Sequence, residues 1–128
     1  MSTMREGKPK ILIVDDNAVL RMCLSELFIR VGLDVRSAWD GFSALSEIRS
    51  QEPDILLSDL NMPGISGFEL LSTVRRDYPL IRAIAMSGDY SGEAVPSGVD
   101  AEAFYEKGRG LGTLTHIVDA MTAQNIAC

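Results

Sequence analysis

Short apolar segments alternate along the chain with longer segments whose apolar residues recur every three or four positions, and this alternation constrains the fold more than any other feature. The short segments have the length and composition of strands that are buried on both faces. The longer segments carry the apolar stripe of amphipathic helices. The expected strands are residues 10–14, 35–38, 54–58, 81–86 and 103–106. The expected helices include residues 20–31, 44–48, 66–78 and 111–121.

The alternation predicts an α/β fold, in which a mostly parallel sheet has right-handed crossovers and helices on both faces. With 128 residues, of which 46% are hydrophobic, the chain has enough apolar material for one core. We therefore expect a polar N-terminal tail at residues 1–9 and one domain at residues 10–126. Glycines and a proline interrupt residues 88–101, so any helix there should be short or irregular.

Charge and composition exclude several classes of function. The net charge of −6 and the pI of about 4.7 argue against a nucleic-acid-binding surface, which needs clustered Lys and Arg. No apolar run approaches the roughly 20 residues of a membrane span, so we expect a cytoplasmic protein that does not contact membranes. Cys23 and Cys128 are far apart and suggest neither a disulfide framework nor a zinc site. Cys23 lies on an apolar helical stripe and is expected in the core.

Polar residues stand at the carboxyl ends of four expected strands. Asp15 and Asp16 follow the first strand, and Asp59 follows the third. Ser87 follows the fourth strand and Lys107 follows the fifth. In doubly wound sheets, ligands bind outside the carboxyl ends of the strands, near the point where the strand order reverses. Each residue alone is an ordinary loop residue, but together they predict a functional site at this edge of the sheet.

Three carboxylates at one edge need a positive partner. Two of them about 4 Å apart repel each other by about 4 kcal/mol at an effective dielectric constant of about 20. Mg²⁺, or Mn²⁺ in its place, suits such oxygen ligands, and Lys107 is the only lysine in the body of the domain. An aspartate beside a metal and a lysine can act as a nucleophile toward phosphorus. We therefore expect Asp59 to accept a phosphoryl group, with Ser87 donating a hydrogen bond to a phosphoryl oxygen.

Four segments carry a resemblance to a known family. They are ILIVDD at residues 11–16, LLSDLNMPGISGFELL at 56–71, AMSG at 85–88 and YEK at 105–107. Over almost its whole length, the chain resembles a response-regulator receiver domain of bacterial two-component signalling. The resemblance implies a flavodoxin-like, doubly wound sheet of five parallel strands in the order 2-1-3-4-5. It also implies a signalling phosphoacceptor rather than an enzyme, apart from self-phosphorylation and autodephosphorylation.

By that resemblance, Asp59 is the residue that is phosphorylated. Asp15 and Asp16 would bind Mg²⁺ directly or through water, and Asn61 would contribute its backbone carbonyl. Lys107 would pair with Asp59 and later with the phosphoryl group. The donor would be a phosphohistidine on a histidine kinase or a histidine phosphotransfer protein.

The same resemblance indicates how the domain switches. Ser87 fills the Ser/Thr switch position, and Phe104, three residues before Lys107, fills the position of the switch aromatic. Asn61 and Asp89 flank the expected phosphoryl position and are predicted to tune the rate of dephosphorylation. Because the last helix runs nearly to the final residue, we expect a stand-alone regulator whose output is another, unknown protein.

Two features depart from the family pattern. Gly108 stands where receivers usually have proline, and with Gly110 and Gly112 it predicts a flexible loop beside Lys107. The family's fourth helix falls in the weak stretch of residues 87–99. We expect the output to use a different face or to depend on the ordering of that segment.

The residues leave three alternatives open. A pseudo-receiver would bind a partner without being phosphorylated, but such chains typically lose site residues that this chain keeps. A phosphatase of the haloacid dehalogenase type needs a second aspartate two residues after the first, where this chain has Asn61. A nucleotide or flavin module could use the glycines at 108–112, but glycine alternation without the full fingerprint is a weak signal.

Overall fold

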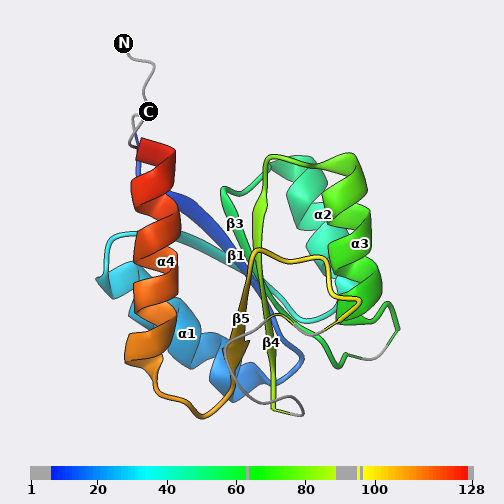
Figure 1. Ribbon diagram of the computed structural model, residues 1–128, viewed down its shortest axis with the longest axis horizontal. Helices are drawn as coiled ribbons and strands as arrows, with labels where there is room; N and C mark the ends of the chain where they lie inside the picture. The colour runs from blue at the N-terminus through cyan, green and yellow to red at the C-terminus, as the bar shows by residue number, and fades with distance from the viewer. Residues whose placement is uncertain (1–6, 63, 89–94, 96, 127–128) are drawn as a thin grey trace.

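The computed structural model describes residues 7–62, 64–88, 95 and 97–126, and shows a parallel sheet between two layers of helices (Figure 1). The strands are β1 (Lys10–Val14), β2 (Asp34–Ala38), β3 (Ile55–Asp59), β4 (Arg82–Ser87) and β5 (Ala103–Glu106). The helices in the described residues are α1 (Ala18–Arg30), α2 (Gly41–Ser50), α3 (Gly67–Asp77) and α4 (Leu111–Ile126). The strand order is β2-β1-β3-β4-β5, which confirms the predicted doubly wound fold.

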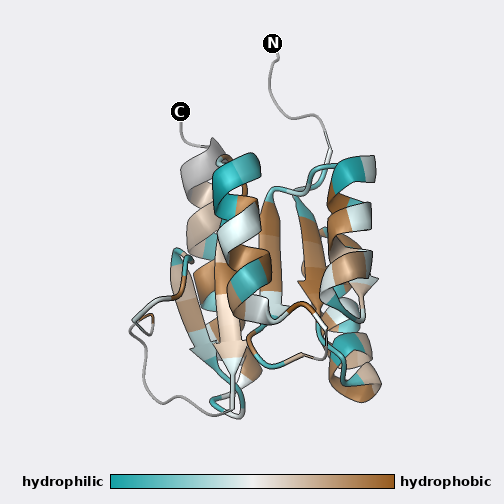
Figure 2. Ribbon diagram, turned by 90° about the vertical axis from the view of Figure 1, so that its right-hand side faces the viewer, coloured by the Kyte–Doolittle hydropathy of each residue, from teal (hydrophilic) through white to brown (hydrophobic). Residues whose placement is uncertain are grey.

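The core lies on both faces of the sheet. Along β3, Leu56 belongs to the cluster that packs under α2 and α3, whereas Ile55 and Leu57 belong to the cluster under α1 and α4. Figure 2 shows these apolar strands between the two helical layers. Successive side chains of a strand point to opposite faces, so a strand covered on both sides must be apolar at every position. This burial explains the unbroken apolar runs of the sequence.

Polar side chains cap the starts of three helices. The side chain of Asn17 accepts a hydrogen bond from the backbone N–H of Leu20 at the start of α1. At the start of α2, the side chain of Asp40 accepts a hydrogen bond from the backbone N–H of Ser43. Ser66 and Glu69 form the predicted capping box of α3, with both hydrogen bonds at 3.2 Å. These caps satisfy backbone N–H groups that have no partner within the helix, and they fix where each crossover begins.

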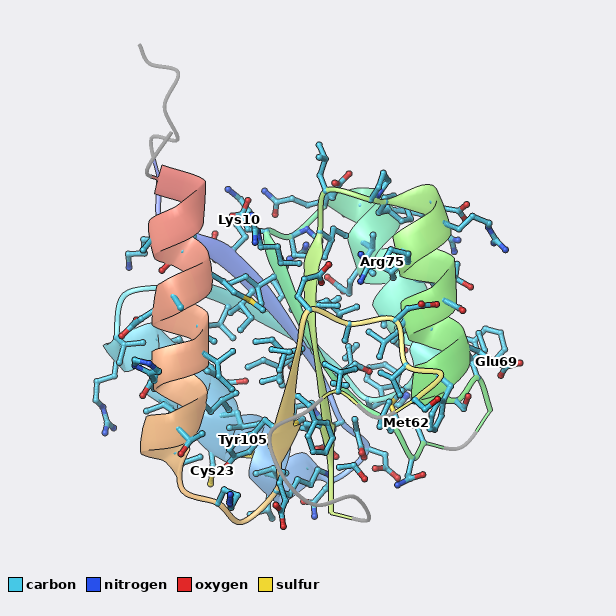
Figure 3. All side chains as sticks on the ribbon, in the orientation of Figure 1. Lys10, Cys23, Met62, Glu69, Arg75 and Tyr105 are labelled. Carbon is cyan, nitrogen blue, oxygen red and sulfur yellow. The ribbon has the colours of Figure 1, made fainter. Side chains whose placement is uncertain are left out.

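The prediction that Cys23 lies in the core was wrong. Cys23, labelled in Figure 3, is exposed on α1, whose fully buried residues are Leu24 and Phe28. Val19 and Met22 of the same helix are also exposed, at 71% and 62%. Because α1 carries more apolar residues than its core-facing side can hold, its pattern does not single out one buried stripe.

The connection between β4 and β5 is partly described. Val95 and residues 97–101 form no helix, in keeping with the short or irregular helix that was predicted for residues 88–101. Residues 89–94 and 96, with Asp89 among them, lie outside the described residues. Val95, Val99 and Ala101 pack against the cluster under α2 and α3. None of the helices in the described part of the chain combines the length and apolar character that a membrane span needs.

Replacing Glu102 with alanine is expected to lower the free energy of unfolding by about 1–3 kcal/mol. Glu102 Oε1 accepts a 2.7 Å hydrogen bond from the backbone N–H of buried Ala83, and Oε2 lies 2.9 Å from Arg75 Nη1 of α3. Without the carboxylate, the Ala83 N–H is left unpaired. Urea unfolding measures the loss. Glu102→Gln is the matched control, since it keeps an acceptor and should lose about 1 kcal/mol or less; equal losses in both variants would contradict the prediction.

Candidate functional site

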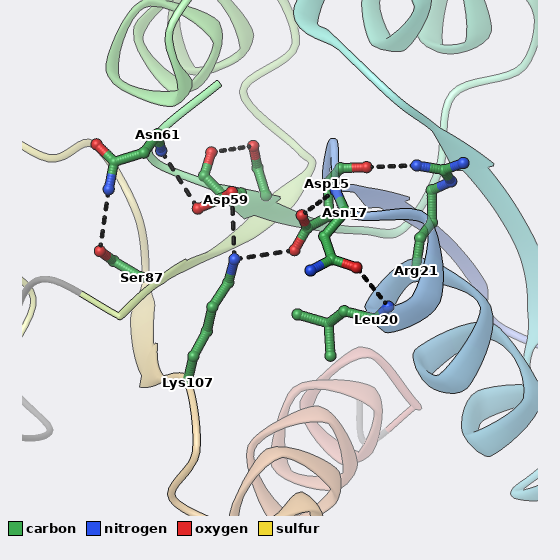
Figure 4. A network of polar contacts seen from close by, with 9 residues as sticks. Asp15, Asn17, Leu20, Arg21, Asp59, Asn61, Ser87 and Lys107 are labelled. Atoms are coloured by element: carbon green, nitrogen blue, oxygen red, sulfur yellow. Dashed lines mark hydrogen bonds and ion pairs between the residues drawn. The ribbon is translucent and has the colours of Figure 1, made fainter. Parts of the chain in front are cut away.

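The carboxyl ends of the central strands bring the predicted polar residues together (Figure 4). Val14 of β1 lies beside Ser58 of β3 in the parallel register, so Asp15 and Asp59 stand at the same level of the sheet. Carboxylate oxygens of Asp15, Asp16 and Asp59 all lie within 4.8 Å of one another. The sequence placed Asp59 after the strand, and in the structure it is the last residue of β3.

Two of the three carboxylates are buried, and a lysine bridges them. Asp15 is 0% exposed and Asp59 is 4% exposed, whereas the neighbouring Asp16 is exposed. Lys107 Nζ lies 3.1 Å from Asp15 Oδ2 and 3.2 Å from Asp59 Oδ2. The lysine therefore holds together two carboxylates that would otherwise repel each other.

Backbone N–H groups hold the other carboxylate oxygens. Asn17 N donates to Asp15 Oδ1 at 2.9 Å, and Asn61 N donates to Asp59 Oδ1 at 3.2 Å. Among the described residues, Asp15 Oδ2 receives no hydrogen bond of good geometry, although it is buried and the Lys107 ammonium is its ion-pair partner. An under-satisfied buried oxygen of this kind is a ready ligand for a cation.

The three carboxylates fit a hard divalent cation. They present anionic oxygens within one small region, and one of those oxygens lacks a hydrogen bond. Mg²⁺ and Mn²⁺ prefer such ligands and keep several bound waters, so a few carboxylates suffice to hold them. Exposed Asp16 lies on the solvent side, where a hydrated ion can enter.

Burial and neighbouring charges shift the pKa values of Asp59 and Lys107. Burial raises the pKa of the Asp59 carboxyl, and nearby Asp15 adds to this, while the Asn61 N–H and Lys107 only partly oppose it. Burial alone would lower the pKa of the Lys107 ammonium, but its contacts with Asp15 and Asp59 together outweigh burial and raise that pKa. Asp59 is thus a carboxylate that the metal-free fold stabilises poorly, next to a firmly protonated lysine.

Asp59→Asn is expected to raise the thermal midpoint of the metal-free protein at pH 7 by a few degrees. A carboxyl whose pKa is raised by folding contributes stability at low pH, and that contribution is lost as the pH rises above the unfolded value of about 4. Asparagine removes this loss because it carries no charge. Thermal unfolding in EDTA between pH 3 and pH 8 tests the prediction. The two midpoints should converge at the acid end, and a variant that is less stable than wild type at pH 7 would contradict it.

Ser87 and Asn61 lie beside the carboxylates, whereas Phe104 lies deeper. Ser87 is fully buried at the end of β4, and Asn61 Nδ2 donates to its Oγ at 3.4 Å. Phe104 is 3% exposed on β5 and belongs to the core cluster under α2 and α3. It also lines a cavity of about 300 Å³ with Val95 and His116 among its walls.

The glycine after the lysine has a conformation that proline cannot adopt. Gly108 has φ of +92°, whereas proline is fixed near −65°. The backbone N–H of Lys107 donates to the Ser87 carbonyl at 2.9 Å, so β5 stays paired with β4 up to the lysine. The backbone of this loop therefore differs at Gly108 from that of a loop with proline there. The loop nevertheless starts from Lys107, whose backbone is held by β4.

The sequence model of the response regulator receiver domain matches residues 11–118. The chain belongs to this family. It is therefore a receiver domain of two-component signalling, and the phosphatase and flavin alternatives are set aside. Receiver domains are signalling phosphoacceptors, and the carboxylate cluster of this one is of the kind that binds a divalent metal.

Two curated relatives show the range of proteins that contain such a domain. The receiver domain is 32% identical over 107 residues to sporulation initiation phosphotransferase F of Bacillus subtilis, covering 84% of this chain and 78% of the relative. It is 40% identical over 72 residues to a protein-glutamate methylesterase/protein-glutamine glutaminase of Anaeromyxobacter dehalogenans, covering 56% of this chain and 21% of the relative. The chain spans about a fifth of the length of that methylesterase and of the transcriptional regulator NtrC of Escherichia coli.

A solved structure has the same fold. The response regulator protein TrrA of Thermotoga maritima, in complex with Mg²⁺-BeF, has a TM-score of 0.81 and 27% identity, with coverage of 88% of this receiver domain and 98% of TrrA. TrrA has also been solved in complex with the histidine kinase ThkA. In that complex, a receiver of this fold is bound to a histidine kinase.

Sequence reasoning missed two residues that shape the receiver site. Asn17 holds Asp15 through its backbone N–H, and Arg21 Nη1 donates to the Asp15 carbonyl at 2.7 Å. The available signal was the position of Arg21, one helical turn after the N-cap of the helix that follows the aspartate pair. That signal is weak, since an arginine near a helix start is ordinarily a surface residue.

Proposed function

We propose that this receiver domain is a stand-alone response regulator in which Asp59 accepts a phosphoryl group in a Mg²⁺-dependent reaction. The donor is a phosphohistidine on a histidine kinase or a histidine phosphotransfer protein. The observation that supports the proposal best is the position of Lys107, whose ammonium lies within 3.2 Å of both Asp15 Oδ2 and Asp59 Oδ2. The proposed receiver domain is residues 10–126, and residues 1–9 are a tail.

The chemistry is a displacement at phosphorus. A carboxylate oxygen of Asp59 attacks the phosphorus, a new O–P bond forms, and the N–P bond to the donor imidazole breaks. The imidazole leaves with the electron pair and takes up a proton. Such transfer needs positioning and charge stabilisation rather than a general base. When bound, the metal supplies positive charge to the phosphoryl oxygens, with Asp15, Asp16, Asp59 and the Asn61 carbonyl as its proposed ligands.

Two residues of this chain then contact the transferred group. The Lys107 ammonium exchanges part of its ion pairing with the carboxylates for a phosphoryl oxygen. The Ser87 hydroxyl turns toward another phosphoryl oxygen and gives up its 3.4 Å contact with Asn61 Nδ2. Phe104 responds to this movement, and the cavity of about 300 Å³ beside it provides room for the ring. The altered surface binds a target protein.

The test is intact-mass spectrometry after incubation with acetyl phosphate and Mg²⁺. The wild type should gain one phosphoryl group, and Asp59→Asn or added EDTA should abolish the gain. Asp34→Asn is the matched control, because Asp34 is exposed at the other end of the sheet. A wild type that stays unmodified with acetyl phosphate and with a phosphohistidine donor would favour the pseudo-receiver alternative.

Asn61→Ala is expected to slow dephosphorylation several-fold with little effect on folding. Asn61 is exposed two residues after Asp59, where its amide can orient the attacking water. The measurement is the decay of the phosphorylated mass after the donor is removed, with Asp100→Ala as the control. Asp89, outside the described residues, is proposed to act on the same water. Unchanged decay in both Asn61→Ala and Asp89→Ala would exclude rate tuning by this pair.

A further inference from the structure

We infer that Arg21 is a positioning residue for the loop that carries Asp15 and Asp16, and that it is needed for tight binding of the divalent cation. Its guanidinium Nη1 donates a 2.7 Å hydrogen bond to the backbone carbonyl of Asp15 (Figure 4). The inference deepens the proposed function and rests on its metal dependence. Arg21 touches neither the carboxylate oxygens nor Asp59 in any contact of the described residues, so it acts through the backbone of Asp15.

The other polar groups of Asp15 face other parts of the site, and its backbone carbonyl accepts the hydrogen bond from Arg21. The Asp15 N–H donates to the Ala38 carbonyl at 3.2 Å and so continues the pairing of β1 with β2. Its Oδ1 accepts from Asn17 N, and its Oδ2 faces Lys107. The hydrogen bond from Arg21 therefore fixes the peptide that joins buried Asp15 to exposed Asp16, and with it the direction in which Asp16 leaves the strand.

The local sequence explains how Arg21 reaches back. Asn17 is the N-cap of α1, and the backbone N–H of Arg21 donates to the Asn17 carbonyl at 3.0 Å, so Arg21 lies in the first full turn. Side chains on a helix lean toward its N-terminus, which directs the arginine toward the loop that precedes the helix. The guanidinium also presents several donors in a rigid fork.

Whether removal of Arg21 weakens or strengthens cation binding distinguishes its positioning role from the effect of its charge. A guanidinium near the site repels a divalent cation, so its removal would strengthen cation binding if charge alone mattered. Because Arg21 binds a carbonyl, it leaves the carboxylate oxygens of the cluster available to the cation. If positioning dominates, removal of Arg21 loosens the loop and weakens cation binding.

The experiment measures binding of Mn²⁺ to the unphosphorylated full chain, using the electron paramagnetic resonance signal of the free ion. Arg21→Met removes the donors and the charge and keeps an unbranched side chain, while Arg21→Lys keeps the charge. Arg30→Met is the control, because Arg30 is exposed in the last turn of the same helix and its loss changes the net charge equally. Circular dichroism verifies that each variant is folded.

Arg21→Met should bind Mn²⁺ about tenfold more weakly than wild type, the usual cost of losing a group that orients a metal ligand. Arg21→Lys should fall between the two, and Arg30→Met should match wild type. Binding by Arg21→Met as tight as that of Arg30→Met, or tighter, overturns the inference. If Arg21→Met does not fold, Arg21→Lys decides, and wild-type affinity in that variant overturns it. A wild type that binds no Mn²⁺ would instead refute the proposed metal dependence itself.

Discussion

Lys107→Met is expected to slow phosphorylation of Asp59 by a factor of about 100 to 1000, the cost of removing one preorganised group that stabilises charge in a transition state. The ammonium lies 3.1 Å from Asp15 Oδ2 and 3.2 Å from Asp59 Oδ2, so it can follow the negative charge as it moves onto the phosphoryl oxygens. The measurement is the rate of mass gain with acetyl phosphate at saturating Mg²⁺. Lys8→Met is the charge-matched control, because Lys8 is exposed and precedes β1, at the opposite end of the strand from Asp15.

The same variant should lose stability in a way that metal can restore. Without Lys107, Asp15 and Asp59 remain buried with no ammonium between them, at 0% and 4% exposure. We expect a loss of about 2 kcal/mol in EDTA, less than for a fully buried pair because the lysine side chain is itself 25% exposed. Mg²⁺ supplies the missing positive charge and should recover most of this loss, but not the transfer rate. Recovery of both would show that the lysine acts only as a counter-ion.

Gly67→Ala is expected to lower the free energy of unfolding by about 3 kcal/mol and to impair phosphorylation at the same time. A Cβ at Gly67 would lie 2.0 Å from the Asp59 carbonyl oxygen and 2.5 Å from Leu60 Cα. Both are backbone atoms, so β3 and α3 must move apart. Since the strand end carries Asp59, the proposed phosphoacceptor, a shift of about 1 Å can cost a factor of about 100 in rate.

Gly112→Ala is the control for this prediction. Gly112 lies in the first turn of α4, and a Cβ added there would meet nothing within 4 Å, so alanine should be neutral or stabilise the helix by up to about 1 kcal/mol. Urea unfolding compares the two variants, and intact mass with acetyl phosphate compares their phosphorylation. Similar stability in Gly67→Ala and Gly112→Ala would contradict the prediction, because it would mean that α3 and the end of β3 can move apart at little cost in free energy.

Much of the fold was predictable because its signals are local. The apolar runs placed β1 and β5 at their observed bounds, and the other strands within one residue. The capping box at Ser66 and Glu69 marked the start of α3. Caps, strand-forming runs and helical periodicity depend on residues that are close in sequence, and the crossovers through α1, α2 and α3 are built from such units.

Predictions that depended on which side of a helix is covered were less successful. Cys23 lies on an apolar pattern, yet it is exposed, because the pattern of α1 continues around the helix. The hydrogen bond from Arg21 to the Asp15 carbonyl also gave no clear sequence signal. Both facts depend on how α1 is rotated against the sheet, and neighbours along the chain do not fix that rotation.

That the polar residues meet at one edge of the sheet follows from the sequence, because parallel strands joined by right-handed crossovers end on the same side. Which of them are buried, and which of them pair, depends on the tertiary structure. Asp15 and Asp16 are adjacent in the chain, but one is fully buried and the other is exposed. Lys107 bridges two carboxylates that come from β1 and β3. Burial and charge coupling depend on atoms that other elements bring within a few Å, and a one-dimensional pattern does not record those distances.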